Sequence, residues 1–445
     1  MAASAMGNAT EWFDYGVYST VAVYITMNFF PGGLESIGTM LGLAVSFVLR
    51  PLGGFVWGPI GDKLGRKSVL ALTIILMSVT TAAIGLIPTH EQIGVWAIIL
   101  LFALRIVQGF TTGGEYGGAA TFMAEYAPDK RRGHYGSFLE FGTLAGFVGG
   151  SGIVLILQTL STDEFMNTWG WRIPFFFALP LGLIGLYLRS QLDETPVFQE
   201  FVEEEKAETK SVKENYKDLF TTHFKQVAIM FGMVTALNVS YYTLLTYQPT
   251  YLSDQLGIEG NHATIVMIVG QVVMMAMIPF LGSLSDRVGR KPMWWTSLIG
   301  LFIMAVPMYL LMRQSFGWAI VAFVVLGVLF IPQLSTISAT FPAMFPTTVR
   351  YAGFAISYNL ATAAFGGTAP LISDSVIAGT GFTLFPAVFM MIACVIGMVA
   401  VYFMTETAGA SLRGDGVPGE CPENLSPIGE KRAGRTEGEL TGSEA

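Results

Sequence analysis

The sequence predicts an all-α membrane protein in which twelve transmembrane helices form two six-helix, pseudo-symmetric bundles. Three observations lead to this prediction. The 445 residues are 52% hydrophobic and 13% charged, whereas soluble proteins carry about 25% charged residues. Apolar stretches of about 20 residues, which is enough to cross a bilayer, recur along the whole chain. Finally, charged motifs in the first half reappear at matching places in the second half.

The apolar stretches define the twelve expected helices. Each stretch is bounded by charged residues, glycines or prolines that favour a loop between membrane spans. In chain order the expected spans are 3–29, 35–60, 68–87, 93–123, 133–158, 172–191, 225–253, 262–284, 292–312, 317–342, 350–378 and 382–404.

The basic residues predict the orientation in the membrane. The loops 62–67, 129–133 and 286–291 are rich in Lys and Arg, and the loops on the opposite side carry mainly Asp and Glu. Loops rich in Lys and Arg stay in the cytoplasm. We therefore expect these three loops, the charged middle segment and both termini to be cytoplasmic.

The charged middle segment divides the spans into six and six. We expect an N-terminal bundle at 1–191, a cytoplasmic linker at 192–223 and a C-terminal bundle at 224–404. The segment 405–445 is rich in Gly, Pro and Glu without a heptad repeat, which predicts a disordered cytoplasmic tail. No cleavable signal peptide is expected, because the first apolar run is too long and lacks a basic start and a small-residue cleavage site. Since the sequence opens almost inside that run, a short cytoplasmic lead is expected to precede residue 1.

Two pairs of loop motifs reveal the internal repeat. "GPIGDKLGRK" (58–67) follows the second span and "GSLSDRVGRK" (282–291) follows the eighth. "PDKRRG" (128–133) follows the fourth span and "PTTVRY" (346–351) follows the tenth. A parallel repeat of six spans is typical of transporters whose halves rock around a central site.

These motifs also carry a family resemblance. The paired GxxxD(K/R)xGRK loops resemble signatures of the major facilitator superfamily. Further stretches resemble its metabolite–proton symporter branch, and within it the bacterial proline/glycine-betaine transporters, over Gly7 to Glu406. The stretches are "GNATEWFDYGVY" (7–18), "LRPLGG" (49–54), "GGEYGGA" (113–119), "WGWRIPFFFALPLG" (169–182), "TYQPTYL" (246–252) and "FPTTVRYAG" (345–353).

The resemblance implies a function. It implies a proton-coupled symporter that imports zwitterionic compatible solutes, such as proline, glycine betaine and related osmolytes, by alternating access across the bacterial cytoplasmic (inner) membrane. The expected partners are the solute, the proton and the lipid bilayer, with no nucleic acid, and the expected functional unit is a monomer. No cofactor is expected, because the proton gradient supplies the energy.

Ionisable residues inside the spans are the candidates for proton coupling, because a charge in a membrane helix is costly and calls for a functional reason. A carboxylate in a partly dehydrated cavity has its pKa raised by desolvation and lowered by a nearby cation. We expect Glu115 and Glu140 to carry the proton and Arg105 to modulate them. Asp14 and Glu11 either take part in proton transfer or attract the cationic solute. The alternative is that Arg105 and Glu115 only pack the spans.

Aromatic residues on the same helix faces are the candidates for solute binding. A quaternary ammonium donates no hydrogen bond, so aromatic faces hold it best. The solute carboxylate would need Arg105, Asn238 or a hydroxyl group. For any one ring, packing or interface anchoring is the alternative. The predicted substrate-binding residues are Trp12, Tyr15, Tyr18, Gln108, Tyr116, Asn238, Tyr241, Tyr242 and Tyr358.

The repeated loops are the candidates for a conformational lock. The resemblance implies that the loop Asp lies near the cytoplasmic start of span 11 and pairs with a loop Arg. This predicts a lock formed by Asp62, Arg66, Asp286 and Arg290. The alternative is that the basic residues only determine topology. Arg50 and Arg172 lie near predicted span ends, where snorkelling to lipid headgroups is as good an explanation as any specific role.

Two other transport functions are left open. Close branches with the same signatures import small carboxylates such as 2-oxoglutarate, and Arg105 would suit an anion. A proton-antiport exporter of amphipathic cations would also use aromatic rings and buried acids. An enzyme is not expected, since the sequence has no HExxH, CxxC, Ser–His–Asp or phosphate-loop motif. No metal site is expected.

Overall fold

Apolar helices make up both halves of the computed structural model, which describes residues 2–30, 35–64, 66–191, 212–413, 416–420 and 425–428. Ten helices in this part of the chain are long and apolar enough to cross a membrane. The first two predicted spans correspond to α1 (Ala2–Thr20) with α2 (Ala22–Phe29), and to α3 (Glu35–Leu64). These two spans and the ten long apolar helices together give the twelve expected spans.

The remaining helices follow the predicted order. The first half continues with α4 (Arg66–Leu86), α5 (His90–Ile93), α6 (Val95–Tyr126), α7 (Arg132–Leu160), α8 (Asp163–Thr168), α9 (Ile173–Phe176) and α10 (Ala178–Ser190). The second half contains α12 (Val212–Thr221), α13 (Phe224–Tyr241), α14 (Gln248–Thr250), α15 (Gly260–Val288), α16 (Arg290–Met312), α17 (Phe316–Leu334), α18 (Ile337–Thr340), α19 (Arg350–Ala361), α20 (Thr368–Thr380) and α21 (Phe385–Phe403).

Two spans near the middle of the molecule are interrupted by π-helical turns. Span 7 passes from α13 through η3 (Tyr242–Thr246), and span 11 passes from α19 through η7 (Thr362–Gly366). A π-turn leaves local backbone groups unpaired and often marks a functional site. The two turns lie close together, because a Cβ on Gly366 would come 2.8 Å from the ring of Tyr242.

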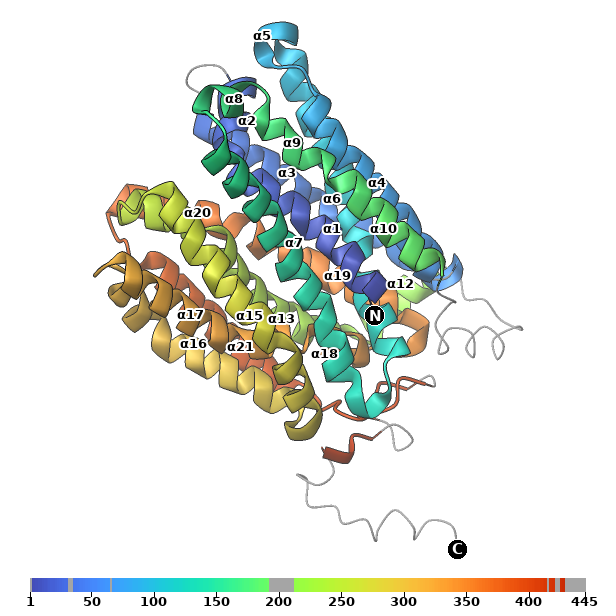
Figure 1. Cartoon of the computed structure of the whole chain (residues 1–445). Helices are drawn as coiled ribbons and strands as arrows, with labels where there is room; N and C mark the ends of the chain where they lie inside the picture. The colour runs from blue at the N-terminus through green and yellow to red at the C-terminus, as the bar shows by residue number, and fades with distance from the viewer. Residues whose placement is uncertain are drawn as a thin grey trace, which may run out of the picture.

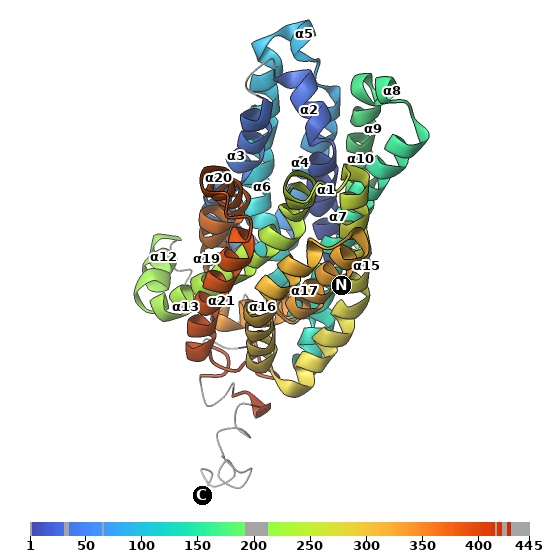
Figure 2. The same cartoon turned by 90° about the vertical axis from the view of Figure 1, so that its left-hand side faces the viewer.

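The two halves form separate bundles that meet along two seams. Figure 1 shows most helices of the first half at the upper right and α15, α16, α17, α20 and α21 of the second half at the lower left, and Figure 2 shows α3 and α6 beside α19. Helix α7 packs against α15, and α3 packs against α19. The first seam joins span 5 (α7) to span 8 (α15), and the second seam joins span 2 (α3) to span 11 (α19). The repeat relates span 2 to span 8 and span 5 to span 11, so the two seams are equivalent.

Glycines allow the close helix packing within the first bundle. A Cβ on Gly146 of α7 would clash with the carbonyl oxygen of Ala9 on α1, and one on Gly109 of α6 would clash with that of Ser46 on α3. Backbones that approach this closely require residues without side chains. The packing of α1 on α7 and of α3 on α6 fixes where the polar residues of these helices point.

One end of the molecule carries the basic connections α3–α4, α6–α7 and α15–α16, and we call it the basic end. The chain after α21 packs here: the carbonyl oxygen of Ala410 accepts from Arg132 at 2.9 Å, and that of Leu412 accepts from Arg350 at 2.8 Å. This differs from the disorder that composition predicts from residue 405 onward. The two arginines account for the difference, since they bind the backbone of the segment whatever its side chains are.

Candidate functional site

A buried ionic network lies within the first bundle. Arg105 of α6 donates to Asp14 of α1 at 2.7 Å and to the side-chain oxygen of Gln108 at 3.0 Å. Gln108 in turn donates to Asp14 at 3.2 Å and to Thr81 of α4 at 2.8 Å. The guanidinium of Arg105 also lies 3.5 Å from the ring centroid of Tyr18. The network therefore ties three helices of one bundle together.

This network changes the expected partners of four candidates. Arg105 was expected to act on Glu115 and Glu140, but its ion pair is with Asp14. Gln108 and Tyr18 were expected among the substrate-binding residues, and the structure places them in this network rather than with the other aromatic candidates. Sequence spacing could not anticipate the pair, because Asp14 and Arg105 are 91 residues apart.

A second ion pair lies nearer the other bundle. Arg50 of α3 donates to Tyr15 at 2.7 Å and to Glu11 at 3.3 Å, and its guanidinium lies 4.6 Å from the ring centroid of Phe47. The side chains of Arg50 and Glu11 are 2% and 1% exposed. Arg50 therefore does not snorkel to the membrane surface. It lies near the middle of α3, which is longer toward the basic end than the sequence predicts.

Aromatic rings from both bundles surround this second pair. Trp12 of α1 lies 5.0 Å from Tyr241, and Phe47 of α3 lies 5.1 Å from Tyr242, measured between ring centroids. Trp12 and Tyr15 are 5.2 Å apart. Phe47 was not among the sequence candidates. These rings form the aromatic cluster, which consists of Trp12, Tyr15, Phe47, Tyr241 and Tyr242 together with Tyr116 and Tyr358.

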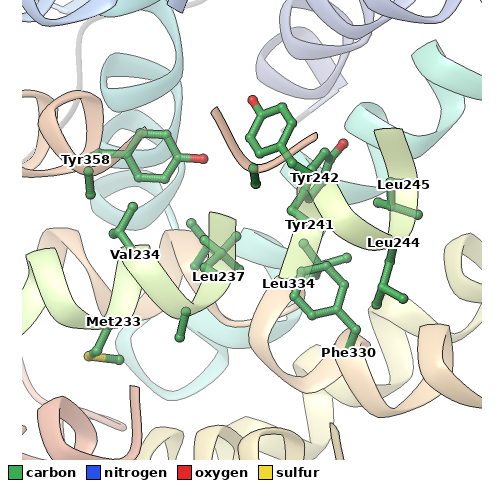
Figure 3. Packing of buried hydrophobic residues seen from close by; sticks show 14 of the residues in the cluster. Met233, Val234, Leu237, Tyr241, Tyr242, Leu244, Leu245, Phe330, Leu334 and Tyr358 are labelled. Carbon is green, nitrogen blue, oxygen red and sulfur yellow. The ribbon is translucent and has the colours of Figure 1, made fainter. Parts of the chain in front are cut away.

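Tyr116 and Tyr358 extend the aromatic cluster toward the seam between α3 and α19. Tyr116 of α6 stacks on Tyr358 of α19, with their centroids 4.6 Å apart. Figure 3 shows Tyr358, Tyr241 and Tyr242 above apolar side chains of α13 that include Val234 and Leu237. The seven rings come from α1, α3 and α6 of one bundle and from α13, η3 and α19 of the other. Six of the nine predicted substrate-binding residues therefore lie together.

Glu140 of α7 lies beside the aromatic cluster. Its carboxylate accepts a hydrogen bond from the hydroxyl group of Tyr116 at 2.5 Å. Its side chain is 2% exposed, and it forms no ion pair among the described residues, unlike Glu11 and Asp14. Glu115 of α6 is also buried, at 1% exposure. Asn238 of α13 donates to Thr362 of η7 at 2.9 Å, so it links the two interrupted spans.

A third group of polar contacts closes the seam at the basic end. Asp286 of α15 accepts from the backbone N–H groups of Gly133 and His134 at 2.8 and 2.9 Å and from Arg290 at 2.6 Å. The two N–H groups belong to the first turn of α7, where backbone donors lack helical partners and the helix dipole favours an anion. A single carboxylate thus joins the two bundles.

The equivalent seam between α3 and α19 is only partly described. The side chains of Asp62 and Arg66 lie outside the described residues, so their predicted contact stays a prediction. Nearby, Arg350 of α19 donates to Glu125 of α6 at 3.0 Å, and both side chains are fully buried. Arg172 donates to the carbonyl oxygens of Gly85 and Ile87, so it holds a loop and does not reach toward lipid.

The geometry suits transport of a small charged solute. Among the described residues, no group of three or more His, Cys, Asp or Glu side chains could hold a metal ion. The buried ionisable groups instead lie on helices of the two bundles that meet along the two seams. Comparison with known proteins supports this interpretation. Residues 5–370 match the Major Facilitator Superfamily.

The chain belongs to the Major Facilitator Superfamily. Its relatives include the glycine betaine/proline/ectoine/pipecolic acid transporter of Dickeya dadantii, with 42% identity over 421 residues that cover 93% of this chain and 84% of the relative. The proline/betaine transporter of Escherichia coli is 41% identical with the same coverage. The ectoine/proline transporter of Corynebacterium glutamicum is 40% identical and covers 92% of this chain and 84% of the relative.

Solved structures of the superfamily confirm the fold. A proton:xylose symporter bound to 6-bromo-6-deoxy-D-glucose superposes with a TM-score of 0.74, over 92% of this chain and 96% of the symporter. The two sequences are 17% identical, so this likeness concerns the fold alone. The superfamily protein described here therefore has the twelve-helix, two-bundle fold that the sequence predicts, and it is a transporter rather than an enzyme.

Proposed function

We propose that the protein is a proton-coupled symporter that imports zwitterionic compatible solutes, such as glycine betaine and proline, by alternating access. It works in the cytoplasmic membrane of a bacterium, with both termini in the cytoplasm. It needs no cofactor beyond the proton gradient, and its functional unit is a monomer. The observation that carries the proposal is the aromatic cluster, to which both bundles contribute rings around the buried pair of Arg50 and Glu11.

The aromatic cluster suits the cationic end of such a solute. A quaternary ammonium is large, weakly hydrated and unable to donate hydrogen bonds, so it is bound best by several aromatic faces, each contributing about 0.5–2 kcal/mol. Trp12 and Tyr241 provide adjacent rings from opposite bundles, at 5.0 Å. A solute held against both rings contacts both bundles at once, and this is what a carrier needs if binding is to favour their closure.

Arg50 and Glu11 suit the charges of a zwitterion. The guanidinium of Arg50 can bind a carboxylate, and the carboxylate of Glu11 can attract an ammonium group. In the absence of solute the two neutralise each other, which limits the cost of burying them. Asp14 and Arg105 form the equivalent pair deeper in the first bundle, where they hold α1 and α6 in position.

Glu140 is the best-placed proton carrier. A buried carboxylate without a cation is costly, and its protonated form is not. Glu140 forms no ion pair among the described residues and touches the aromatic cluster through Tyr116. When the bundles rock and Glu140 is exposed to water on one side, it can release the proton there. Glu115, whose side chain is also buried, is the second candidate.

The contacts of Asp286 support a lock at the basic end. Asp286 joins α15 to the first turn of α7 and is held by Arg290. Opening this side of the transporter requires these hydrogen bonds to break. By the internal repeat, we propose the same role for Asp62 and Arg66 at the seam of α3 and α19.

One observation favours a second substrate class. Arg50 is a buried guanidinium beside the aromatic cluster, and a guanidinium also suits small carboxylates such as 2-oxoglutarate. Uptake into proteoliposomes that contain the purified protein distinguishes the two classes. Accumulation of labelled glycine betaine that depends on an inward proton gradient supports the proposal. Accumulation of 2-oxoglutarate without betaine uptake contradicts it, and so does export of a lipophilic cation.

A further inference from the structure

Gln271 in α15 is a buried polar residue that neither the family motifs nor the aromatic cluster includes. Its side chain is 1% exposed, and both its amide nitrogen and its amide oxygen lack a hydrogen-bond partner within the described residues. Unpaired amide groups are costly to bury, and most buried polar groups in proteins are paired. A glutamine that only fills space between helices would be replaced at no cost by methionine or leucine.

Helical geometry places Gln271 on the face of α15 that meets the other bundle. Residues 271, 275, 278, 282 and 286 follow the spacing of one helix face. At the basic end this face touches α7: a Cβ on Gly282 would come 2.6 Å from the carbonyl oxygen of Gly133, and Asp286 binds the backbone of Gly133 and His134. Gln271 lies eleven residues from Gly282, about 16 Å along the helix.

Glu140 lies on the facing side of the same seam. Residues 133, 137, 140 and 144 share one face of α7, and this face meets α15 because Gly133 and Ser137 both contact Gly282. Helices α7 and α15 are antiparallel: α7 begins near this contact and α15 ends near it, so both helices extend to the same side of it. Glu140 is seven residues from Gly133 along α7, and Gln271 is eleven residues from Gly282 along α15, both on the side away from the basic end. The two side chains therefore point to one seam and differ by about 6 Å in height.

Two other unpaired polar groups lie in the aromatic cluster. The indole Nε1 of Trp12 and the hydroxyl group of Tyr241 are buried without a hydrogen-bond partner among the described residues. Trp12 is on α1, which packs on α7, and Tyr241 contacts Phe330 of α17, which packs on α15. The helix that carries Gln271 is thus a neighbour of α17, whose Phe330 contacts the aromatic cluster.

We propose that Gln271 is a solute-binding residue, whose amide donates a hydrogen bond to the carboxylate of the zwitterionic solute while the aromatic cluster holds the ammonium group. The inference rests on the proposed function. It gives the second bundle a polar contact with the solute, opposite Arg50 of the first bundle. It also places the solute carboxylate beside Glu140. Protonation of Glu140 removes the negative charge that would repel the solute carboxylate, so binding of the solute and binding of the proton favour each other.

Binding of glycine betaine and choline to the purified protein tests this inference. Choline has the same quaternary ammonium group and no carboxylate. In Gln271→Met, the dissociation constant for betaine should rise at least about tenfold, because a hydrogen bond to a charged group is lost, while competition by choline should be unchanged. The matched control is Gln226→Met, since Gln226 is a buried glutamine with an unpaired amide oxygen at the start of α13, and it should bind betaine like the wild type.

Each outcome decides the inference. The same preference for betaine over choline in Gln271→Met as in the wild type would overturn it. If wild-type protein binds no betaine, the proposed function fails instead, and the two failures are thus distinguished. If Gln271→Met does not fold, Gln271→Glu is the second test variant, because it keeps the size of the side chain and places a carboxylate opposite the carboxylate of the solute. Betaine affinity should fall at least tenfold there, and wild-type affinity would overturn the inference.

Discussion

Replacing Glu140 by glutamine tests proton coupling at the residue best placed for it. The glutamine keeps the size of the side chain and can still accept the hydrogen bond from Tyr116, which the carboxylate accepts at 2.5 Å. It cannot bind or release a proton at neutral pH. We expect Glu140→Gln to bind and exchange solute and to lose the ability to concentrate it.

The size of the effect follows from one carboxyl group carrying one proton in each cycle. A gradient of one pH unit across the membrane is worth 1.36 kcal/mol for each proton, which corresponds to about a tenfold solute gradient. With the membrane potential held at zero, wild-type proteoliposomes should therefore reach an internal betaine concentration about ten times the external one. Glu140→Gln should reach a ratio of about one.

The assay compares labelled betaine inside vesicles with and without the pH gradient, and then measures exchange of labelled for unlabelled betaine without a gradient. Glu164→Gln is the matched control, because Glu164 is exposed in the short helix α8 and should accumulate betaine like the wild type. Tenfold accumulation by Glu140→Gln would refute its role. Loss of exchange as well would show a defect in binding rather than in coupling.

Three further changes test other parts of the account. Tyr242→Leu should raise the KM for betaine uptake about two- to thirtyfold, because one cation–π contact of about 0.5–2 kcal/mol is lost; an unchanged KM would remove Tyr242 from the site. Arg350→Met should destabilise the protein by about 3–5 kcal/mol, since it breaks a fully buried ion pair by removing the cation that faces Glu125, and an unchanged melting temperature in detergent would contradict this. Asp286→Asn should open the basic end and speed thiol labelling of a cysteine placed at Ser338, which is buried at the start of α18; labelling at the wild-type rate would argue against a lock.

The fold could be predicted because its determinants are local and repeated. Each span is a run of apolar residues of membrane length, and the loops at 58–67 and 282–291 show the duplication directly. Helical spacing also placed Glu11 and Tyr15 on one face of α1. The packed segment near Ala410 was not predicted, because it is held through its backbone carbonyl groups, which composition does not reveal.

The pairing of the charges could not be predicted, because it depends on how separate helices pack. Asp14 could pair with any cation in the same layer of the membrane, and only the packing of α1 on α6 selects Arg105. Arg50 was misjudged as a residue near a span end, although the predicted span 35–60 already placed it in the interior of the helix, where α3 (Glu35–Leu64) also places it. The signal was present, since Arg50 and Glu11 are opposite charges in adjacent apolar spans.

Proton movement into proteoliposomes, followed by a pH-sensitive dye trapped inside them, tests the central claim most directly. The purified wild-type protein is reconstituted without a pH gradient, an inward betaine gradient is imposed, and the internal pH is recorded with the membrane potential held at zero. We predict that betaine entry acidifies the interior and that Glu140→Gln abolishes the signal. Betaine entry without acidification in the wild type would contradict proton-coupled import.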